Sequence, residues 1–309
     1  MSFNLSGLSA YTDQLSTDLI TKAILKPQSV GYLTVRPGLT AGTTAINILG
    51  GVIDIKDSTC GFGAGQVGNN TTAYTQIDLV VQSKMLKEQL CPEDLRNYWL
   101  SAYMNPSAYQ ESVPFEVAIA DYKVRSISAY IETTLWNGDG ANLDGLLAQI
   151  NVANGAVNGS AYGGAWTSST AVDNMWGLID LLPTALKQED DLVAYMSYAQ
   201  YSKLTQNLIA TGNSILLQYP NISNTAGTSA ASTFVFPGTN VTVFAAPGIN
   251  TNEVIVGSKK YAFMGTGLID DQDAFKFYYN PADDIVNFMS KFRLGTAALA
   301  DQFVSSSAY

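Results

Sequence analysis

The sequence predicts an α+β fold with two lobes and with segments that extend beyond them. The chain has 309 residues, more than one hydrophobic core usually organises, and 47% of them are hydrophobic, which is enough to fill two cores. A long helical pattern lies near the middle of the chain, and strand patterns fill most of the last third. No run approaches the roughly 18 apolar residues of a membrane-spanning helix, and the N-terminus has no signal-peptide pattern.

The first segment is an amphipathic helical pattern at residues 8–25, LSAYTDQLSTDLITKAIL, which Pro27 ends. Its apolar stripe consists of Leu8, Tyr11, Leu15, Leu19 and Ala23. The neighbouring sequence offers no obvious apolar surface to cover this stripe. We therefore expect an arm whose residues Leu15 and Leu19 contact another subunit.

The stretch CGFGAGQVGNN, residues 60–70, contains a GxGxxG pattern. Such a pattern binds a dinucleotide where a helix follows it, because the helix N-terminus directs amide groups and a dipole at the phosphates. Here VIDIK before the glycines and AYTQIDLVV after them both read as strands. We therefore predict the glycine-rich tip of a long hairpin and no cofactor site. The expected contacts of this hairpin with a neighbouring subunit are Phe62, Gly63, Gly65, Gly68 and Tyr74.

The strongest helical pattern, PFEVAIADYKVRSISAYIETTLWN, begins at Pro114 and ends before Gly138. At about 1.5 Å per residue it forms a rod of about 35 Å. Its apolar residues fall in two rows, so we expect it to be covered on two sides. One row is Phe115, Ile119, Tyr122, Ala129 and Thr133, and the other is Val117, Val124, Ile127, Ile131 and Leu135.

The sequence NGDGANLDG at residues 137–145 follows this helix and admits two interpretations. Gly138, Asp139 and Gly140 suit a turn that caps the helix, because glycine tolerates the left-handed backbone such a turn needs. The other interpretation is a calcium site with oxygen ligands from Asn137, Asp139, Asn142 and Asp144. The spacing does not match an EF-hand loop. The prediction is therefore the capping turn, and no metal site is assigned.

The remaining elements alternate between helix and strand. Helical patterns occupy residues 91–105, 171–186 and 199–212, and loop-like composition occupies residues 151–170 and 221–233. Strand patterns occupy residues 192–197, 241–248, 253–258, 261–265 and 275–281, and the chain finishes in IVNFMSKFRLGTAALADQFV. No internal repeat is present in the sequence.

The composition argues against an enzyme. The chain has no histidine, which removes the commonest general base, the usual metal ligand and every Ser-His or Cys-His pair. We therefore assign no catalytic, cofactor-binding or metal residues. Charged residues make up 14% against about a quarter in ordinary soluble domains, and there are 17 tyrosines. Both features suit surfaces covered by other subunits, although a surface rich in Ser, Thr and Asn also accounts for the low charge.

Two other function classes remain open at this point. The Tyr, Asn and Thr content and the many strands also suit an adhesive or carbohydrate-binding surface protein. A hydrolase that uses carboxylates alone would need two acidic side chains within catalytic reach. Acidic pairs occur at Asp190–Asp191, Asp270–Asp271 and Asp283–Asp284. Each pair stands near a turn, where solvated loop carboxylates are expected.

The order of the elements resembles one known family. The features that carry the resemblance are the arm, the glycine-tipped hairpin, the long helix ending in WNGDGANLDGLL, the segment DNMWGLIDLLPTALKQEDDLVAYMSYAQYSKLTQ and the strands that end in FRLGTAALADQFV. Together they resemble the major capsid proteins of tailed bacteriophages, which have the Hong Kong 97-like fold. AYTQIDLVVQSKMLKEQLCPEDLRNYWL is also similar to segments of phage capsid proteins. The resemblance covers nearly the whole chain.

The resemblance implies a division of the chain into named parts. Residues 1–29 would be the N-terminal arm, and residues 30–84 would be the extended loop, or E-loop, with the glycine-rich stretch at its tip. Residues 85–137 would form the peripheral domain with its spine helix, and residues 276–309 would return to that domain. Residues 138–275 would form the axial domain.

The resemblance also implies a structural function. Subunits of this family assemble as hexamers and pentamers into an icosahedral shell around double-stranded DNA, which they do not read by sequence. Portal, scaffolding and decoration proteins are the further partners that it implies. The location would be the virion capsid, after assembly in the bacterial host cytoplasm and without a membrane. A net charge of −10 argues against binding DNA by phosphate neutralisation but not against enclosing it.

Some family features have no clear counterpart in this sequence. There is no charged helical scaffolding segment at the N-terminus. Some relatives crosslink a loop lysine to an asparagine of another subunit, and Lys56 or Lys84 could occupy that place, but nothing marks the partner. Cys60 and Cys91 form no metal-ligand spacing and no disulfide framework, so a reducing compartment is expected and their mutual contact is left open.

Overall fold

The structure is a computed structural model that describes residues 28–57, 60, 70–91, 114–211, 233–267, 275–280 and 285–307. The helix expected at residues 8–25 lies outside the described residues. The same holds for the helix expected at 91–105, apart from Cys91, and for the loop expected at 221–233, apart from Thr233.

The described strands form two six-stranded sheets. The first sheet has the order β1-β9-β11-β3-β2, with β10 paired to β11 beside that path. Its strands are β1 (Thr34–Arg36), β2 (Gly42–Val52), β3 (Thr71–Leu90), β9 (Ala262–Thr266), β10 (Phe275–Asn280) and β11 (Ile285–Ala298). The second sheet has the order β4-β12-β8-β5-β7-β6. Its strands are β4 (Val157–Asn158), β5 (Leu192–Met196), β6 (Thr233–Val235), β7 (Thr242–Ala245), β8 (Val254–Ser258) and β12 (Phe303–Ser305).

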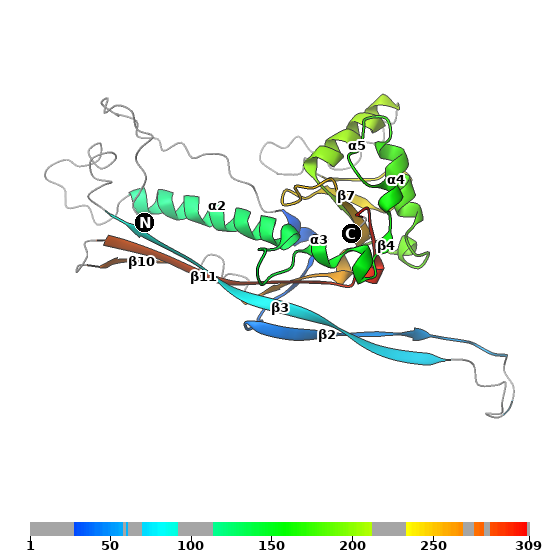
Figure 1. Ribbon diagram of the computed structural model, residues 1–309, viewed down its shortest axis with the longest axis horizontal. Helices are drawn as coiled ribbons and strands as arrows, with labels where there is room; N and C mark the ends of the chain where they lie inside the picture. Colours follow the sequence, from blue (N-terminus) through cyan, green and yellow to red (C-terminus); the bar gives the residue numbers. More distant parts are fainter. Residues whose placement is uncertain are drawn as a thin grey trace.

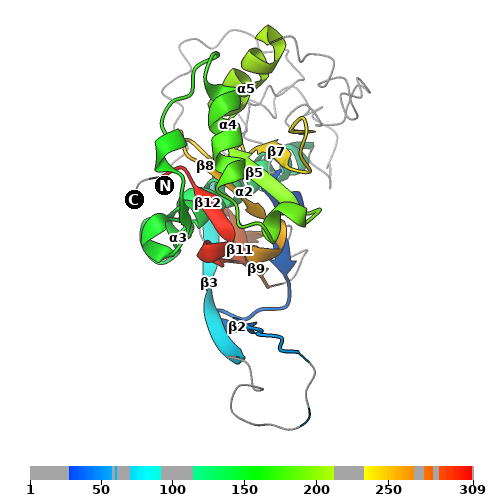
Figure 2. The ribbon, with the colours of Figure 1, turned by 90° about the vertical axis from the view of Figure 1, so that its right-hand side faces the viewer.

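Strand β3 is the longest element of the first sheet. It contains 20 residues, which corresponds to about 65 Å at about 3.3 Å per residue. One part pairs antiparallel with β11, and the other part pairs antiparallel with β2 and leaves the body as a long hairpin (Figures 1 and 2). The strand expected over VIDIK, residues 52–56, is formed only at Val52, which is the last residue of β2.

Helix α2 (Pro114–Asn137) lies along β11 and β3 of the first sheet (Figure 1). Ile127, Ile131 and Leu135 form its buried stripe, which joins the core together with Phe292 and Leu294 of β11. The expectation that two rows are covered is wrong for the described part of the helix. Tyr122 and Thr133 of the other row are exposed because the sheet covers only one side of the helix.

Three shorter helices are described after α2. α3 (Leu146–Gln149) contacts α2 and β11 of the first sheet. α4 (Ala171–Asp180) and α5 (Tyr198–Ala210) lie next to each other on the second sheet (Figures 1 and 2). Met175 and Leu178 of α4 and Leu204 and Leu208 of α5 are buried against the strands in one cluster. The helix expected over 171–186 ends at Asp180 because Pro183 follows, and only the single 3-10 turn η5 (Leu186–Gln188) comes after it.

Short 3-10 helices connect these elements: η1 (Ser29–Tyr32), η3 (Val152–Asn154), η4 (Ser160–Tyr162), η8 (Lys259–Tyr261) and η10 (Ala300–Gln302). The division between the two sheets does not follow the domain limits expected from the sequence. Residue 84 lies within β3, strand β9 belongs to the first sheet although it precedes residue 275, and β12 belongs to the second sheet although it follows residue 276.

Candidate assembly surface

The β2–β3 hairpin presents two faces, because successive side chains of a strand point to opposite sides. The register places Ile46 opposite Ile77, and Ile48 opposite Thr75, so these residues share one face. Leu49 stands opposite Tyr74 on the other face. The alternation of apolar and polar residues in both strands is the sequence pattern that selects this structure.

The hairpin is packed at its base and exposed beyond it. At the base, Leu79 and Val81 form a small buried cluster with Phe263 and Ala297, and Ile46 and Ile77 pack against it. Farther out, 63% of Leu49 and 76% of Tyr74 are exposed. Val52, Ile53 and Ile55 are also exposed. The outer half of the hairpin therefore carries apolar side chains on both faces with no described partner in the chain.

Such a hairpin is suited to contact another chain. An isolated two-stranded ribbon is marginally stable in water, and exposed apolar side chains grouped on one element usually mark an interaction surface. Among the described strands, β2 is at the edge of the first sheet, so one of its edges has backbone groups that pair with no described strand. Burial by a neighbour would satisfy both the side chains and the edge.

Only one of the contact residues expected from the sequence, Tyr74, belongs to the described part of the chain. Leu15, Leu19, Phe62, Gly63, Gly65 and Gly68 lie outside the described residues. Tyr74 lies on the outer half of the hairpin and is exposed. The element that follows the glycines is strand β3, which begins at Thr71, and so the chain does not continue into a helix there.

The base of the N-terminal segment is fixed to α2 by a buried carboxylate. Glu132 Oε2 accepts hydrogen bonds from the backbone N–H groups of Gln28 (3.1 Å) and Ser29 (3.2 Å), and Oε1 accepts one from the Ser29 hydroxyl. Trp136 Nε1 donates to the same Ser29 Oγ at 2.8 Å. Glu132, Ser29 and Trp136 are all buried. The sequence patterns did not single out this group, although an acidic residue next to the buried stripe of a helix is a usable signal.

The chain after Ser29 is fixed to the second sheet. The Tyr195 hydroxyl of β5 donates to the backbone carbonyl of Tyr32 at 2.6 Å. Burial raises the pKa of the Tyr195 phenol, so the group stays protonated and remains a donor. The Tyr32 ring stacks on Phe244 with centroids 4.2 Å apart. The segment that leads towards the N-terminus therefore leaves from the junction of α2 and the second sheet.

The turn after α2 is built around Asp139. Gly138 follows the last helical residue with φ of 78°, in the left-handed region, and its N–H donates to Thr134 O at 2.8 Å. Asp139 Oδ1 accepts from the backbone N–H groups of Ala141, Asn142 and Leu143, each at 2.9 Å. Asp139, one of the four residues considered as calcium ligands, thus uses its Oδ1 to accept hydrogen bonds from the turn.

Asp139 also ties the hairpin strand to the turn. Its Oδ2 forms an ion pair with Lys84 Nζ from β3, and both side chains are largely buried. The hydrogen bond from Lys84, followed by those from the backbone amides of the turn, holds the pKa of Asp139 well below its usual range, and burial opposes this effect only in part. Of the two lysines considered for crosslinking, Lys84 is therefore engaged within the subunit. Lys56 pairs with Asp54 at 3.0 Å on the exposed stretch after β2.

The two cysteines are free and lie off opposite ends of β3. Cys60 is exposed and lies between the two hairpin strands in sequence, whereas Cys91 directly follows Leu90. The eight residues from Val52 to Cys60 can span at most about 28 Å, against about 65 Å for β3. Cys60 and Cys91 of one subunit therefore do not approach one another.

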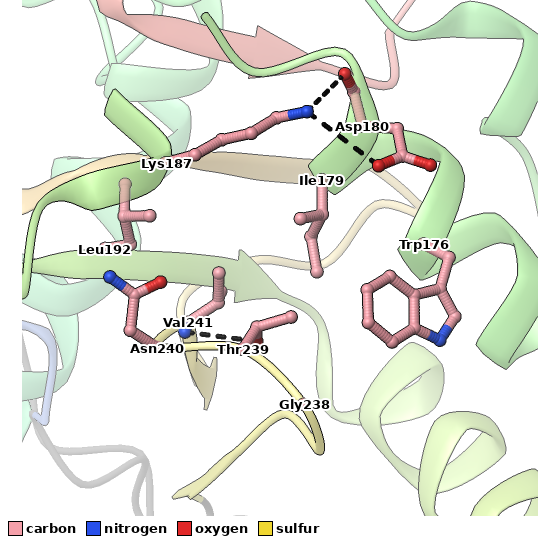
Figure 3. A pocket seen from close by; sticks show the side chains of 9 residues that line it. All are labelled: Trp176, Ile179, Asp180, Lys187, Leu192, Gly238, Thr239, Asn240 and Val241. Carbon is pink, nitrogen blue, oxygen red and sulfur yellow. Dashed lines mark hydrogen bonds and ion pairs between the residues drawn. The ribbon is translucent and has the colours of Figure 1, made fainter. Parts of the chain in front are cut away.

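A hollow of about 570 Å³ lies beside α4, next to the second sheet (Figure 3). The half-exposed ring of Trp176 forms one wall, and the turn at Gly238 forms another. Its charged side chains pair with each other: Lys187 Nζ donates to the backbone carbonyl of Asp180 at 2.9 Å and lies 3.8 Å from its carboxylate. Asn240 Nδ2 donates to the backbone carbonyl of Glu189. Lys187, Asp180 and Asn240 thus make hydrogen bonds or ion pairs within the subunit.

Nowhere among the described residues do three or more His, Cys, Asp or Glu side chains come together as they would around a metal ion. None of the helices described combines the length and the hydropathy that a membrane span requires.

The fold is similar to those of solved phage and GTA-particle structures. The capsid of the native GTA particle matches with a TM-score of 0.54 and 14% identity, over 97% of this chain and 97% of that chain. The capsid of Myoviridae phage XM1 matches with a TM-score of 0.56 and 12% identity, over 98% and 97%. A structure from Mycobacterium phage Adephagia matches with a TM-score of 0.56 and 11% identity, over 99% and 98%.

These matches extend over both sheets, α2 and the hairpin, and thus over nearly the whole chain. Comparisons with protein-family models and with curated protein sequences gave no match. At such low identity the likeness concerns the fold alone. From the β2–β3 hairpin to the second sheet, the chain has the fold of phage capsid proteins.

Proposed function

We propose that the chain is the shell-forming subunit of a tailed-phage capsid and has the Hong Kong 97-like form of this fold. The observation that carries the proposal is the β2–β3 hairpin, which leaves the body with exposed Leu49 and Tyr74 on one face and exposed Val52 on the other. The fold shared with the GTA and XM1 capsids supports the same function.

In this proposal the named capsid parts follow the two sheets rather than single sequence limits. The first sheet with α2 is the peripheral domain, its β2–β3 hairpin is the E-loop, and the second sheet with α4 and α5 is the axial domain. Residues up to the Ser29–Glu132 junction are the arm. The turn of Gly138, Asp139 and Gly140 closes the spine helix and fixes it to the hairpin strand through Lys84.

The mechanism is cooperative self-association. Arm, hairpin and domain edges would engage several neighbouring copies at once, so that contacts of modest strength add up to a stable shell. Hexamers and pentamers around double-stranded DNA are the assembly we propose, in a virion formed in the host cytoplasm, with portal, scaffolding and decoration proteins as further partners. Its function is structural and not enzymatic.

Sedimentation of the purified chain tests the proposal. We expect megadalton particles from the full chain, or from the chain with its scaffolding protein, whereas a stable 33.0 kDa species under both conditions would contradict it. That second outcome would favour the adhesive or carbohydrate-binding alternative.

A hairpin variant shows whether the hairpin carries the assembly. Leu49→Ser with Tyr74→Ser removes two exposed apolar side chains, so we expect an unchanged melting temperature but loss of particles. The matched control is Tyr198→Ser with Ile209→Ser, which changes two similarly exposed side chains on α5. Normal particles from the hairpin variant, or equal losses from both variants, would contradict the assigned role of the hairpin.

A further inference from the structure

The hollow beside α4 has an aromatic wall that is held in place. The Trp176 residue of α4 is 38% exposed, although a tryptophan ring gains most when it is covered. Phe236 meets the ring edge-on, with ring centroids 5.2 Å apart. A Cβ on Gly238 would lie 3.5 Å from Trp176 Cη2, so the backbone of that turn also packs close to the ring. The ring is therefore positioned by the fold, while part of it remains open to solvent.

Another wall of the hollow is the turn between β6 and β7, which hydrogen bonds hold in shape. The backbone N–H of Phe236 donates to the Val241 carbonyl at 2.8 Å, and that of Thr239 donates to the Phe236 carbonyl at 3.1 Å. Thr239 Oγ1 accepts from the Val241 N–H at 3.2 Å. The hollow is thus formed before any ligand arrives, and its volume of about 570 Å³ lies within the range of small-molecule sites.

The polar groups around the hollow keep free hydrogen-bonding capacity. The Asp180 side chain is 77% exposed, and its carboxylate, 3.8 Å from Lys187 Nζ, accepts no hydrogen bond from a described residue. Asn240 donates to the Glu189 carbonyl through Nδ2, and its amide oxygen lies on the side of the hollow (Figure 3). Lys187 uses one of its three N–H donors for the Asp180 carbonyl. The hollow therefore offers acceptors and donors together.

The charge and the burial of the lining favour a neutral, polar ligand. The cation Lys187 and the anion Asp180 offset each other, so a charged ligand finds no uncompensated partner. The aliphatic floor offers little surface, because Ile179, Leu192 and Val241 are 6%, 1% and 1% exposed. A purely apolar ligand or side chain would therefore bury little further area. Binding has to combine one aromatic face with several hydrogen bonds.

We propose that this hollow binds a neutral pyranose ring of a glycan. A pyranose carries C–H groups on one face and hydroxyl groups around its edge, and each hydroxyl both donates and accepts. The C–H face would lie on the exposed part of Trp176, because the negative face of an aromatic ring attracts slightly positive hydrogens. Hydroxyl groups would donate to the Asp180 carboxylate and to Asn240 Oδ1, and Lys187 Nζ would donate to a sugar oxygen. This binding would be separate from the hairpin contacts and does not depend on the proposed shell function.

Saturation-transfer NMR on the full-length, unassembled chain tests the proposal. The probes are the methyl glycosides of glucose, galactose, mannose and N-acetylglucosamine. We expect saturation of the ring protons of at least one glycoside, with a dissociation constant of about 1 mM, because a single ring makes few contacts. Trp176→Ala removes the aromatic face and should weaken binding about tenfold. The matched control is Tyr198→Ala, which removes a 68% exposed ring from α5 and should leave binding unchanged.

A second variant separates binding from folding. In Asp180→Asn, Lys187 keeps its 2.9 Å bond to the backbone carbonyl of residue 180, so we expect an unchanged melting temperature. We expect about a fivefold loss of affinity, because a neutral amide replaces a charged acceptor. The charge-matched control is Asp190→Asn, at an exposed residue that does not line the hollow. Absence of binding of every probe by the natural chain, or equal losses in the variants and their controls, would overturn the proposal.

Immobilised glycosides distinguish a surface glycan from a soluble sugar as the ligand. Assembled particles present many copies of the hollow, so beads carrying the best glycoside should retain particles where single subunits wash off. Retention supports a surface glycan, whereas binding by subunits without retention of particles supports a soluble sugar. Loss of particles from Trp176→Ala, with no sugar binding by the natural chain, would overturn the proposal and assign the hollow to a contact between copies. Sugar binding by a chain that never forms particles would support the site and count against the shell function.

Discussion

At the scale of single residues, Asp139 joins three parts of the subunit through one carboxyl group. It accepts three backbone hydrogen bonds from the turn after α2 and pairs with Lys84 of β3. Asp139→Ala removes all of these interactions and leaves Lys84 partly buried without its partner, so we expect a loss of about 2–3 kcal/mol in the free energy of unfolding. Urea denaturation of the unassembled subunit measures this loss. Asp139→Asn keeps an acceptor oxygen and should cost less.

The same carboxyl group predicts a pH dependence. Its pKa is lowered in the folded state, mainly by Lys84, so its ionisation stabilises the fold above the ordinary Asp pKa of about 3.9, and this contribution is lost as pH falls below about 4. We expect the stability difference between the natural chain and Asp139→Asn to be constant near neutral pH and to shrink in acid. A difference that stays the same down to about pH 3 would contradict this assignment.

The glycines on either side of Asp139 give a matched pair. Gly138 and Gly140 have φ of 78° and 72°, respectively. A Cβ on Gly138 would lie 2.5 Å from the Leu143 carbonyl oxygen, whereas a Cβ on Gly140 would meet nothing within 4 Å. We expect Gly140→Ala to cost about 1 kcal/mol from the backbone alone, and Gly138→Ala to cost about 3 kcal/mol or more from backbone strain plus the clash. Equal losses in melting experiments would show that the turn adjusts freely.

At the scale of elements, the N-terminal segment and α2 are coupled through Ser29 and Glu132. Glu132→Ala removes the carboxylate that accepts from two backbone N–H groups and a hydroxyl, and we expect it to destabilise the subunit by about 2–4 kcal/mol. Ser29→Ala removes one of these bonds and one bond to Trp136. A double-mutant cycle on the two positions should give a coupling of at least about 1 kcal/mol in urea denaturation. Additive effects would mean that the bonds contribute little to holding the segment on the helix.

The elements differ in how well local sequence predicts them. The sequence predicts that α2 begins at Pro114 and ends before Gly138, because proline and glycine act at the helix ends themselves. The alternation of apolar and polar residues predicts the two hairpin strands. It does not predict that β2 ends at Val52, because the residues up to Lys56 keep a strand-like pattern. The strand ends there because the pair of Val52 with Thr71 is the last one between β2 and β3. The position of Glu132 beside the buried stripe was a local signal, but its pairing with Ser29 could not be predicted, because 103 residues separate the two and no local pattern reports such a contact.

At the scale of the whole molecule, the assignment of strands to sheets lies beyond sequence reasoning. β9 pairs with β1 and β11, and β12 pairs with β4 and β8, so each crosses the domain limit expected from chain order. Both strands are short and apolar, and either sheet could accept them by pattern alone. Their places depend on which long-range partners complete each core, and this depends on the entire fold.

The division between arm and body leads to a prediction for truncations. Residues up to 27 lie before the Ser29–Glu132 junction, so we expect a chain without residues 1–27 to keep the melting temperature of the full chain and to lose particle formation. A chain without residues 1–29 also loses Ser29, and we expect it to melt at a lower temperature. Electron microscopy and melting of the two truncations together separate assembly from folding. Normal shells from the shorter truncation would show that the first 27 residues contribute no contact the shell needs, and the hairpin would then remain as the element that joins the subunits.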